Sequence, residues 1–267
     1  MTENDERFIR TVRLLGRPAL RKLQDSRVVV VGLGAVGSYA VEGLARGGVG
    51  ALRLVDFDVV RPSNINRQLY ALESTLGQPK AELAKGRVLD INPRCRVEAL
   101  RLFAHADTLE TILAGPPDLV VDAIDALNPK VELITAALRR KLPLLSSMGA
   151  ARRTDPAAIR VGPFAEVQSC RLARMVRRRL RRRQLPFDFP CVYSNEPTTR
   201  GAEDEEAWDN SDFVGSGRPR RLMGSLPTIT GLFGLRLAHA AIFLLLGKTQ
   251  MNGLGATASG ASSGKCR

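Results

Sequence analysis

The chain has 267 residues, 44% of them hydrophobic, which is enough for one large domain or for one domain with a lobe attached. Its formal net charge of +13 favours an anionic partner, most simply a nucleic acid, although a general bias towards Arg would produce the same excess. The four cysteines form no Cys-x-x-Cys pair and the charged amino terminus has no apolar core, which argues against a disulfide framework, a paired-knuckle zinc site and a signal peptide.

Helix and strand patterns alternate over the first 150 residues. Residues 7–27 have apolar side chains at helical spacing, and Gly16 and Pro18 divide them into two short helices. The elements expected next are strands at 28–31, 51–57, 96–103, 117–125 and 142–150, separated by helices at 36–46, 73–90, 107–114 and 129–141. A β-branched run such as 28–31 is typical of a strand buried on both faces. The alternation therefore predicts an α/β, Rossmann-like fold with a doubly wound, mostly parallel sheet.

The alternation weakens after residue 150. A highly basic helix is expected at 170–185, and the polar, acidic and Gly-rich stretch at 198–221 is expected to be a mobile loop. The apolar run at 226–247 is interrupted by one Arg and one His and is barely long enough to cross a membrane. We therefore expect a core helix there, with a membrane-associated helix as the alternative.

A glycine-rich loop follows the first strand directly and precedes a helix. Gly32, Gly34 and Gly37 form G-x-G-x-x-G, in which the glycines permit a tight turn, phosphate approach and close helix packing. The helix amino terminus offers free N–H groups to phosphates, and Asp56 stands at the end of the second strand, where an acid binds ribose hydroxyls. These features predict a nucleotide site. NAD, FAD and ATP proteins all share them, and a purely structural glycine turn is the alternative.

The polar cluster "SNINRQ" at 63–68 helps to separate these classes. Asn64, Arg67 and Gln68 lie just beyond the second strand, on the side of the expected ligand, and Lys80 follows at the start of a helix. Arg grips phosphate through two hydrogen bonds and Lys acts as a point charge, so an Arg and a Lys that converge on one site suit a triphosphate. The cluster therefore favours ATP.

The sequence "DAID" closes the fourth strand and places Asp122 and Asp125 at or beyond the carboxyl edge of the sheet, where α/β proteins bind ligands. A carboxylate beside a polyphosphate normally holds Mg²⁺. Each charge alone could be a solvated surface group, but their convergence on one edge predicts a site for ATP and Mg²⁺.

The chain resembles the ThiF-like superfamily of ATP-dependent activating enzymes, which includes sulfur-carrier adenylyltransferases and ubiquitin-activating enzymes. The resemblance covers residues 7–150 and rests on "RFIR", "GLGAVGS", "LVDFD", "SNINRQ", "GQPK", "INP" and "DAID". Within the superfamily, "SNINRQ" and "DAIDALNPK" most resemble the tRNA threonylcarbamoyladenosine dehydratases, and the missing Cys-x-x-Cys pairs also favour that branch. This resemblance implies an ATP-dependent dehydration that cyclises threonylcarbamoyladenosine in tRNA through an acyl-adenylate of the threonyl carboxylate.

The resemblance also assigns roles by position. Nucleotide binding falls to Gly32, Gly34, Gly37, Asp56, Asp58, Asn64 and Gln68, and catalysis to Arg10, Arg67, Lys80, Asp125 and Cys191. Asp125 is the magnesium-side acid. Arg10 is the arginine that superfamily members send into the partner subunit's site, which implies a homodimer. Cys191 would act as a nucleophile, and a small buried cysteine is the alternative.

The basic helix expected at 170–185 fits a tRNA substrate. Eight Arg and no acid lie between Arg171 and Arg183, a density that suits contact with phosphates without base readout. The candidate contacts are Arg174, Arg177, Arg178, Arg181 and Arg182. A solvated helix face is the alternative.

The chain is thus expected to contain an ATP-binding adenylation domain at 1–160, a basic helical segment at 161–197, a mobile acidic loop at 198–221, a helix completing the fold at 222–247 and a disordered tail at 248–267. A cytoplasmic location without stable membrane association is expected. Three other functions stay open. The first is an adenylyltransferase that acts on the C-terminal Gly of a sulfur-carrier or ubiquitin-like protein and has a sulfur-relay protein as its partner. The second is a nicotinamide oxidoreductase, and the third is a non-catalytic RNA-binding module.

Overall fold

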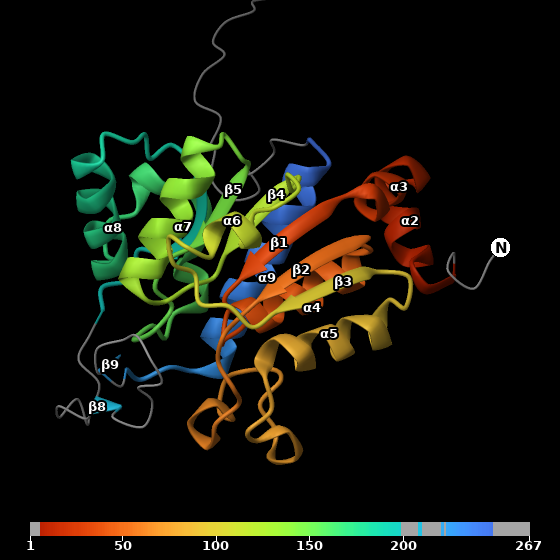
Figure 1. The fold of residues 1–267 in the computed structure, drawn as a ribbon, viewed down its shortest axis with the longest axis horizontal. Helices are drawn as coiled ribbons and strands as arrows, with labels where there is room; N and C mark the ends of the chain where they lie inside the picture. Colours follow the sequence, from red (N-terminus) through yellow and green to blue (C-terminus); the bar gives the residue numbers. More distant parts are fainter. Residues whose placement is uncertain (1–5, 199–207, 210–219, 222, 248–267) are drawn as a thin grey trace, which may run out of the picture.

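A seven-stranded sheet forms the centre of the molecule (Figure 1). The computed structural model describes residues 6–198, 208–209, 220–221 and 223–247, so the expected disordered tail and most of the expected mobile loop lie outside the described residues. In spatial order the strands are β3 (Arg96–Leu100), β2 (Ala51–Val55), β1 (Arg27–Val31), β4 (Leu119–Asp122), β5 (Leu144–Ser147), β7 (Pro190–Ser194) and β6 (Ile159–Pro163).

The strands pair in parallel except at one edge, where β6 runs antiparallel to β7. The chain first extends the sheet from β1 to β2 and β3, then crosses back to place β4 on the other side of β1. This arrangement confirms the α/β, Rossmann-like, mostly parallel fold. It also creates a topological switch point between the carboxyl ends of β1 and β4, where such sheets bind ligands.

Helices cover both faces of the sheet. One face carries α4 (Gly37–Gly47), α5 (Lys80–Ile91) and α9 (Pro227–Leu245), and the other carries α6 (Leu109–Ile112), α7 (Leu127–Arg139) and α8 (Arg171–Arg182). The short helices α2 (Ile9–Leu15) and α3 (Arg17–Asp25) lie at the end of the molecule opposite α8 (Figure 1). Alternate valines of β1 enter the two cores and are at most 3% exposed, as a strand covered on both faces requires.

Helix α9 serves as a core helix. Among the described residues it is the one helix whose length and composition would allow it to cross a membrane, but 56% of its most apolar window is buried inside the fold. It packs closely along α4 because Gly234 has no side chain. A Cβ atom there would lie 2.4 Å from the carbonyl oxygen of Val36 and 2.6 Å from the Cβ atom of Tyr39.

The helix expected at 73–90 begins later than the sequence pattern indicates, at Lys80. Glu73–Thr75 forms a separate 3-10 turn, Gly77 has a φ of +77°, and Pro79 is extended. A continuous helix cannot pass through these residues because Pro restricts both itself and the residue before it. The later start places Lys80 at the first position of α5.

Strands β6 and β7 are absent from the elements expected from the sequence. Both are short and end or begin at a proline, so neither shows a clear alternation. The expected boundary at residue 160 falls within β6, and the segment 161–197 contributes β7 to the main sheet. The remaining elements are the 3-10 turns η1 (Pro62–Asn64), η2 (Glu73–Thr75), η3 (Pro156–Ala158) and η4 (Phe164–Glu166), and the paired strands β8 (Trp208–Asp209) and β9 (Arg220–Arg221).

Candidate functional site

The glycine loop between β1 and α4 lies at the switch point. Gly32 has a φ of +91°, and a Cβ atom there would lie 2.9 Å from the backbone of Ala123, in the turn after β4. A Cβ atom on Gly37 would lie 1.8 Å from the carbonyl oxygen of Gly32, so both positions require glycine. Around Gly34, only the Gln68 side chain comes within 4 Å of such an atom, at 3.7 Å. The loop is therefore closed against β4 and open at Gly34, where a phosphate can approach the backbone.

Two carboxylates after β2 connect this loop to α5. Asp56 accepts hydrogen bonds from the backbone N–H groups of Leu33 at 2.7 Å and Asp58 at 2.9 Å. Asp58 pairs with the buried Lys80, with 2.6 Å between Oδ2 and Nζ, and with Arg61 at 3.4 Å. Burial raises the pKa of Asp56, and the ammonium group of Lys80 opposes that rise. Asp56, Asp58 and Lys80 are thus brought together beside the glycine loop.

The "SNINRQ" turn leaves β2 and is held by its own side chains. Asn64 is 7% exposed, and its Oδ1 accepts a hydrogen bond from the backbone N–H of Arg61 at 3.2 Å. The partly exposed Arg67 donates from Nη1 to the Ser63 carbonyl at 2.7 Å and to Oδ1 of Asn66 at 2.8 Å. A phosphate would have to replace these bonds to neutral acceptors, and a bidentate Arg–phosphate pair, with a charge on both partners, is the stronger interaction.

A buried ion pair lies directly under the turn that carries Asp125. Asp122 and Lys130 are fully buried, with 2.7 Å between Oδ2 and Nζ. Ser146 donates to the same carboxylate at 2.6 Å, and Lys130 also donates to the carbonyl of Ile124 at 2.9 Å. These bonds hold the turn that presents the exposed Asp125 at the sheet edge. The sequence analysis did not identify Lys130 as a functional residue. The sequence feature that indicates its burial is its place among the apolar positions of α7.

Arg10 is far from this group within one chain. It is exposed on α2, and the neighbouring Arg7 donates to the carbonyl of Ile91, the last residue of α5, at 2.7 Å. Lys80 begins the same helix of 12 residues, which is about 18 Å long. The structure therefore places Arg10 near the amino-terminal edge of the sheet and Lys80 at the carboxyl edge.

Helix α8 carries the predicted basic surface on one side. Ala173, Val176 and Leu180 are buried against the second core. Four of the five predicted tRNA contacts are exposed, and a further arginine that the prediction omitted is exposed with them. The exposed arginines are Arg171, Arg174, Arg178, Arg181 and Arg182. We call these five residues the basic face of α8.

Arg177 differs from the other predicted contacts because it is used inside the fold. Its Nη2 donates to the carbonyl oxygens of Phe164 and Val167, both at 3.0 Å, and its guanidinium lies 5.1 Å from the centroid of the Phe164 ring. Arg183 likewise pairs with Glu132 on α7. Local sequence cannot separate such anchoring arginines from exposed ones, since all belong to one uninterrupted basic run.

Cys191 lies within the sheet, on the strand next to the edge strand β6. It is 0% exposed on β7, where it pairs with Ser146 on β5. Burial raises the pKa of its thiol well above the ordinary range. A nucleophile needs an accessible thiolate, so this setting supports the alternative of a small packed cysteine.

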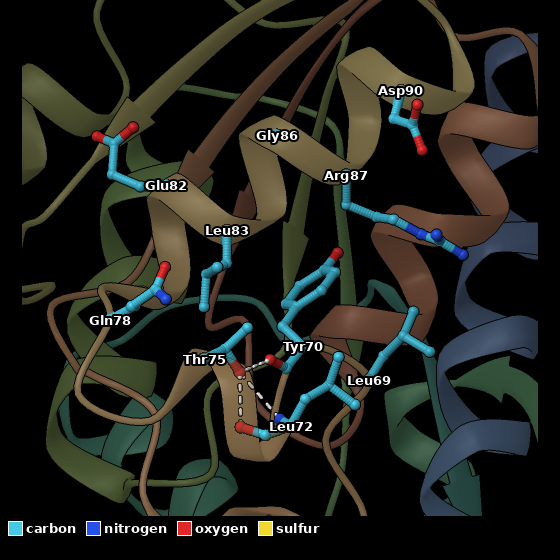
Figure 2. Close-up of a pocket in the computed structure, with 10 residues that line it drawn as sticks. All are labelled: Leu69, Tyr70, Leu72, Thr75, Gln78, Glu82, Leu83, Gly86, Arg87 and Asp90. Carbon is cyan, nitrogen blue, oxygen red and sulfur yellow. Dashed lines mark hydrogen bonds between the residues drawn. The ribbon is translucent and has the colours of Figure 1, made fainter.

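A separate cavity of about 600 Å³ lies between α5 and residues 69–78 (Figure 2). Tyr70 and Leu83 project into it, and Glu82 and Arg87 stand at its rim. None of the predicted nucleotide-binding residues lines this cavity. The glycine loop and the two carboxylates after β2 meet elsewhere, at the switch point.

In the described part of the chain, no group of three or more His, Cys, Asp or Glu side chains forms a preassembled metal site. Mg²⁺ is commonly bound through one or two carboxylates, substrate phosphates and water. The exposed carboxylate of Asp125 fits that kind of shared site.

The chain is similar to proteins of known activity over most of its length. A model of the ThiF family matches residues 6–260. The tRNA threonylcarbamoyladenosine dehydratase of Bacillus subtilis is 39% identical over 228 residues, which are 84% of this chain and 90% of that protein. The molybdopterin-synthase adenylyltransferase of Salmonella typhimurium is 37% identical over 148 residues, which are 55% of this chain and 58% of that protein.

Solved structures of the E. coli tRNA N6-threonylcarbamoyladenosine dehydratase share the fold. Its complex with AMP has a TM-score of 0.81 and 33% identity, covering 91% of this chain and 95% of that one. Its complex with ATP has a TM-score of 0.79 and 33% identity, covering 93% and 97%.

The buried ion pair under the Asp125 turn yields a stability prediction. Lys130→Met leaves the Asp122 carboxylate buried without its counter-charge, so it should lower the free energy of unfolding by about 3–5 kcal/mol. The double variant Asp122→Asn/Lys130→Met should lose less, because no buried charge remains. Urea denaturation of both variants measures the difference. A double variant no more stable than Lys130→Met would contradict this account.

Proposed function

Because the chain belongs to the ThiF family, we propose that it catalyses the ATP-dependent cyclisation of threonylcarbamoyladenosine in tRNA, with loss of one water molecule. The observation that carries the proposal is the extent of similarity. The similarity to a dehydratase covers 84% of the chain, whereas the similarity to an adenylyltransferase covers 55% of it.

The first step is adenylation of the substrate. The threonyl carboxylate attacks the α-phosphate of ATP, pyrophosphate leaves, and an acyl-adenylate forms. Negative charge grows on the α-phosphoryl oxygens and on pyrophosphate, and fixed cations stabilise it. Lys80 is suited to this role because Asp58 already holds its ammonium group at 2.6 Å beside the glycine loop. Arg67 supplies a second, more mobile cation.

The second step closes the ring. The carbamoyl group of the same substituent attacks the activated carbonyl, and AMP leaves. Because this attack is intramolecular, a high effective molarity drives it without an enzyme nucleophile. The buried position of Cys191 is compatible with such a route.

Mg²⁺ would be held by Asp125 and the ATP phosphates, where it offsets phosphate charge during adenylation. The ion pair of Asp122 and Lys130 supports this assignment, because it orients the turn on which Asp125 stands.

The functional unit in this proposal is a homodimer. Arg10 lies at the edge of the sheet opposite Lys80, so it can join a nucleotide site only in a second copy of the chain. A C2 dimer would complete both sites in the same way.

The basic face of α8 would bind the tRNA backbone, since exposed guanidinium groups make charge-assisted bonds to phosphates. With a tRNA substrate, the location that we propose for the protein is the cytoplasm. A second candidate function is adenylation of the C-terminal Gly of a sulfur-carrier protein. The similarity to the Salmonella adenylyltransferase supports this candidate.

The cyclisation assay tests the main proposal. The full chain, ATP, Mg²⁺ and tRNA bearing the linear nucleoside should yield a nucleoside lighter by one water. Lys80→Ala and Arg67→Ala should each slow the reaction by about 100-fold or more, because each removes a cation from the transition state. Lys85→Ala, on the same helix, is the matched control. No mass loss with a folded protein would refute the dehydratase function.

Complementation tests the dimer. Arg10→Ala and Arg67→Ala should each be inactive alone. After the two are mixed and allowed to exchange subunits, mixed dimers contain one intact site, so about a quarter of wild-type activity should return. If the mixture stays inactive while mass spectrometry detects mixed dimers, Arg10 does not act in the partner's site.

Salt dependence tests the basic face of α8. Replacing Arg174, Arg178, Arg181 and Arg182 with Gln should weaken tRNA binding and flatten the plot of log Kd against log salt by about 0.7–0.9 per lost contact. The control replaces four exposed cations near the other end of the molecule, Arg13, Arg21, Lys22 and Arg94. Equal slopes for the two variants would show that α8 is only a solvated face.

A further inference from the structure

Helix α9 is buried on one side and carries a row of accessible, mostly apolar side chains on the other. Leu232 is 37% exposed and Leu235 is 47% exposed. His239 is exposed, and Ile242 and Leu246 are half-buried. These five residues follow one another at intervals of three, four, three and four positions, which is the spacing of a helix face that packs along another helix. We call them the outer stripe of α9.

The inner side of α9 already has its partners within the chain. Phe233, Leu237 and Ala241 are fully buried in the first core. The outer stripe borders α4 without being covered by it, because Leu235 keeps its exposure although its Cδ2 lies 3.9 Å from where a Cβ atom on Gly43 would stand. A continuous exposed apolar surface of this kind marks an interaction site.

Polar side chains lie in and beside the stripe. On α4, Nε of Arg46 lies 2.7 Å from Oε1 of Glu42, and the Arg46 side chain is 58% exposed. Gly43 brings this turn of α4 next to Leu235. His239 lies within the stripe itself. A lipid bilayer would have to desolvate these polar groups, whereas a protein interface has a polar rim around an apolar centre. This face therefore fits a protein partner.

The stripe is nearly symmetric about its middle residue. Leu232 and Leu246 each lie seven positions from His239, and Leu235 and Ile242 lie four and three positions from it. A twofold axis through His239 and perpendicular to α9 would pair the helix antiparallel with its own copy. Leu232 would then face the partner's Leu246, and Leu235 would face the partner's Ile242. The stripe can thus cover itself.

Antiparallel pairing would also bring the two edges of the sheet together. Helix α9 begins at the carboxyl edge, where Nδ2 of Asn66 donates to the carbonyl oxygen of Ser225 at 3.3 Å. It ends near α3, since a Cβ atom on Gly247 would lie 3.6 Å from Nζ of Lys22. In an antiparallel pair, the amino edge of one copy lies beside the carboxyl edge of the other. Arg10, on α2 directly before α3, would then lie on the side of the partner's nucleotide site.

We propose that the outer stripe of α9 is the centre of a C2 homodimer interface, in which α9 packs antiparallel on α9 of a second copy with His239 at the axis. The inference rests on the homodimer of the proposed function and names the face that forms it. A parallel pairing would place the same edges of the two sheets together, and Arg10 would be far from both nucleotide sites. The antiparallel pair satisfies the apolar stripe and Arg10 at once.

Cross-linking at single cysteines tests this arrangement in the full-length protein. His239→Cys is made together with Cys266→Ser, since the other three cysteines are buried, and is treated with a short bismaleimide. The two copies of position 239 lie at the axis, so a covalent dimer should form. Thr228→Cys, exposed on the same helix, is the matched control. Its two copies should be about 33 Å apart, so it should yield at least about tenfold less dimer.

The cross-linking yields decide between the possible arrangements. Equal yields at the two positions, or a higher yield for Thr228→Cys, would overturn the antiparallel pairing. A protein that sediments as a dimer but gives no cross-link with His239→Cys would overturn the assignment of the interface to this face. Neither measurement uses ATP or tRNA. The interface can therefore fail while the cyclisation assay succeeds, and the reverse.

A charge within the stripe should dissociate the dimer. Leu235→Glu places two carboxylates in the interface, so the Kd measured by analytical ultracentrifugation should rise by about 100-fold or more. Phe57→Glu is the matched control, because Phe57 is 46% exposed and packs against the ring of Phe103, outside the stripe. Equal Kd values for the two variants, or a wild-type monomer that floats with phosphatidylglycerol vesicles, would overturn the proposal. If Leu235→Glu does not fold, the two cross-linking yields decide.

Discussion

The buried ion pair of Asp122 and Lys130 lies under the switch point between β1 and β4. Both side chains are fully buried, so each needs the other, and the Ser146 hydroxyl and the Ile124 backbone complete their bonding. The turn after β4 is therefore held from below. On its other side, the turn after β4 contacts Gly32, where the backbone of Ala123 leaves no room for a Cβ atom. These constraints shape the opening at Gly34 and the position of Asp125.

Most, but not all, of the candidate functional residues lie at the carboxyl edge of the sheet. The glycine loop, the two carboxylates after β2 and the buried Lys80 meet there through short contacts. Arg10 lies at the opposite edge and the basic face of α8 at the far end of the molecule from α2 (Figure 1). In the proposed enzyme, one chain supplies the nucleotide edge, a second copy supplies the missing cation, and α8 extends the contact to the tRNA backbone.

Burial separates residues of one type into different roles. Arg177 donates to two backbone carbonyls, Arg153 is buried and donates to the carbonyl of Ser169, and Arg182 is exposed, although all three belong to the carboxyl-terminal half of the chain. The cysteines divide in the same way, because Cys170 caps a helix while Cys191 lies within the sheet. Their chemistry follows from what each side chain contacts and how far it is removed from water.

The fold class, the glycine loop and the order of the elements up to β5 could be predicted from the amino-acid sequence, since these depend on local periodicity and on residues with special backbone freedom. It also marked the basic helix. The start of α5 at Lys80, the two short strands β6 and β7, and the partners of the buried charges depend on contacts between segments that are distant in the sequence. Lys80 meets a carboxylate 22 residues away and Asp122 a hydroxyl 24 residues away. Periodicity reports neighbours within a few residues, whereas the partner of a buried charge is set by the desolvation that distant segments impose when they pack.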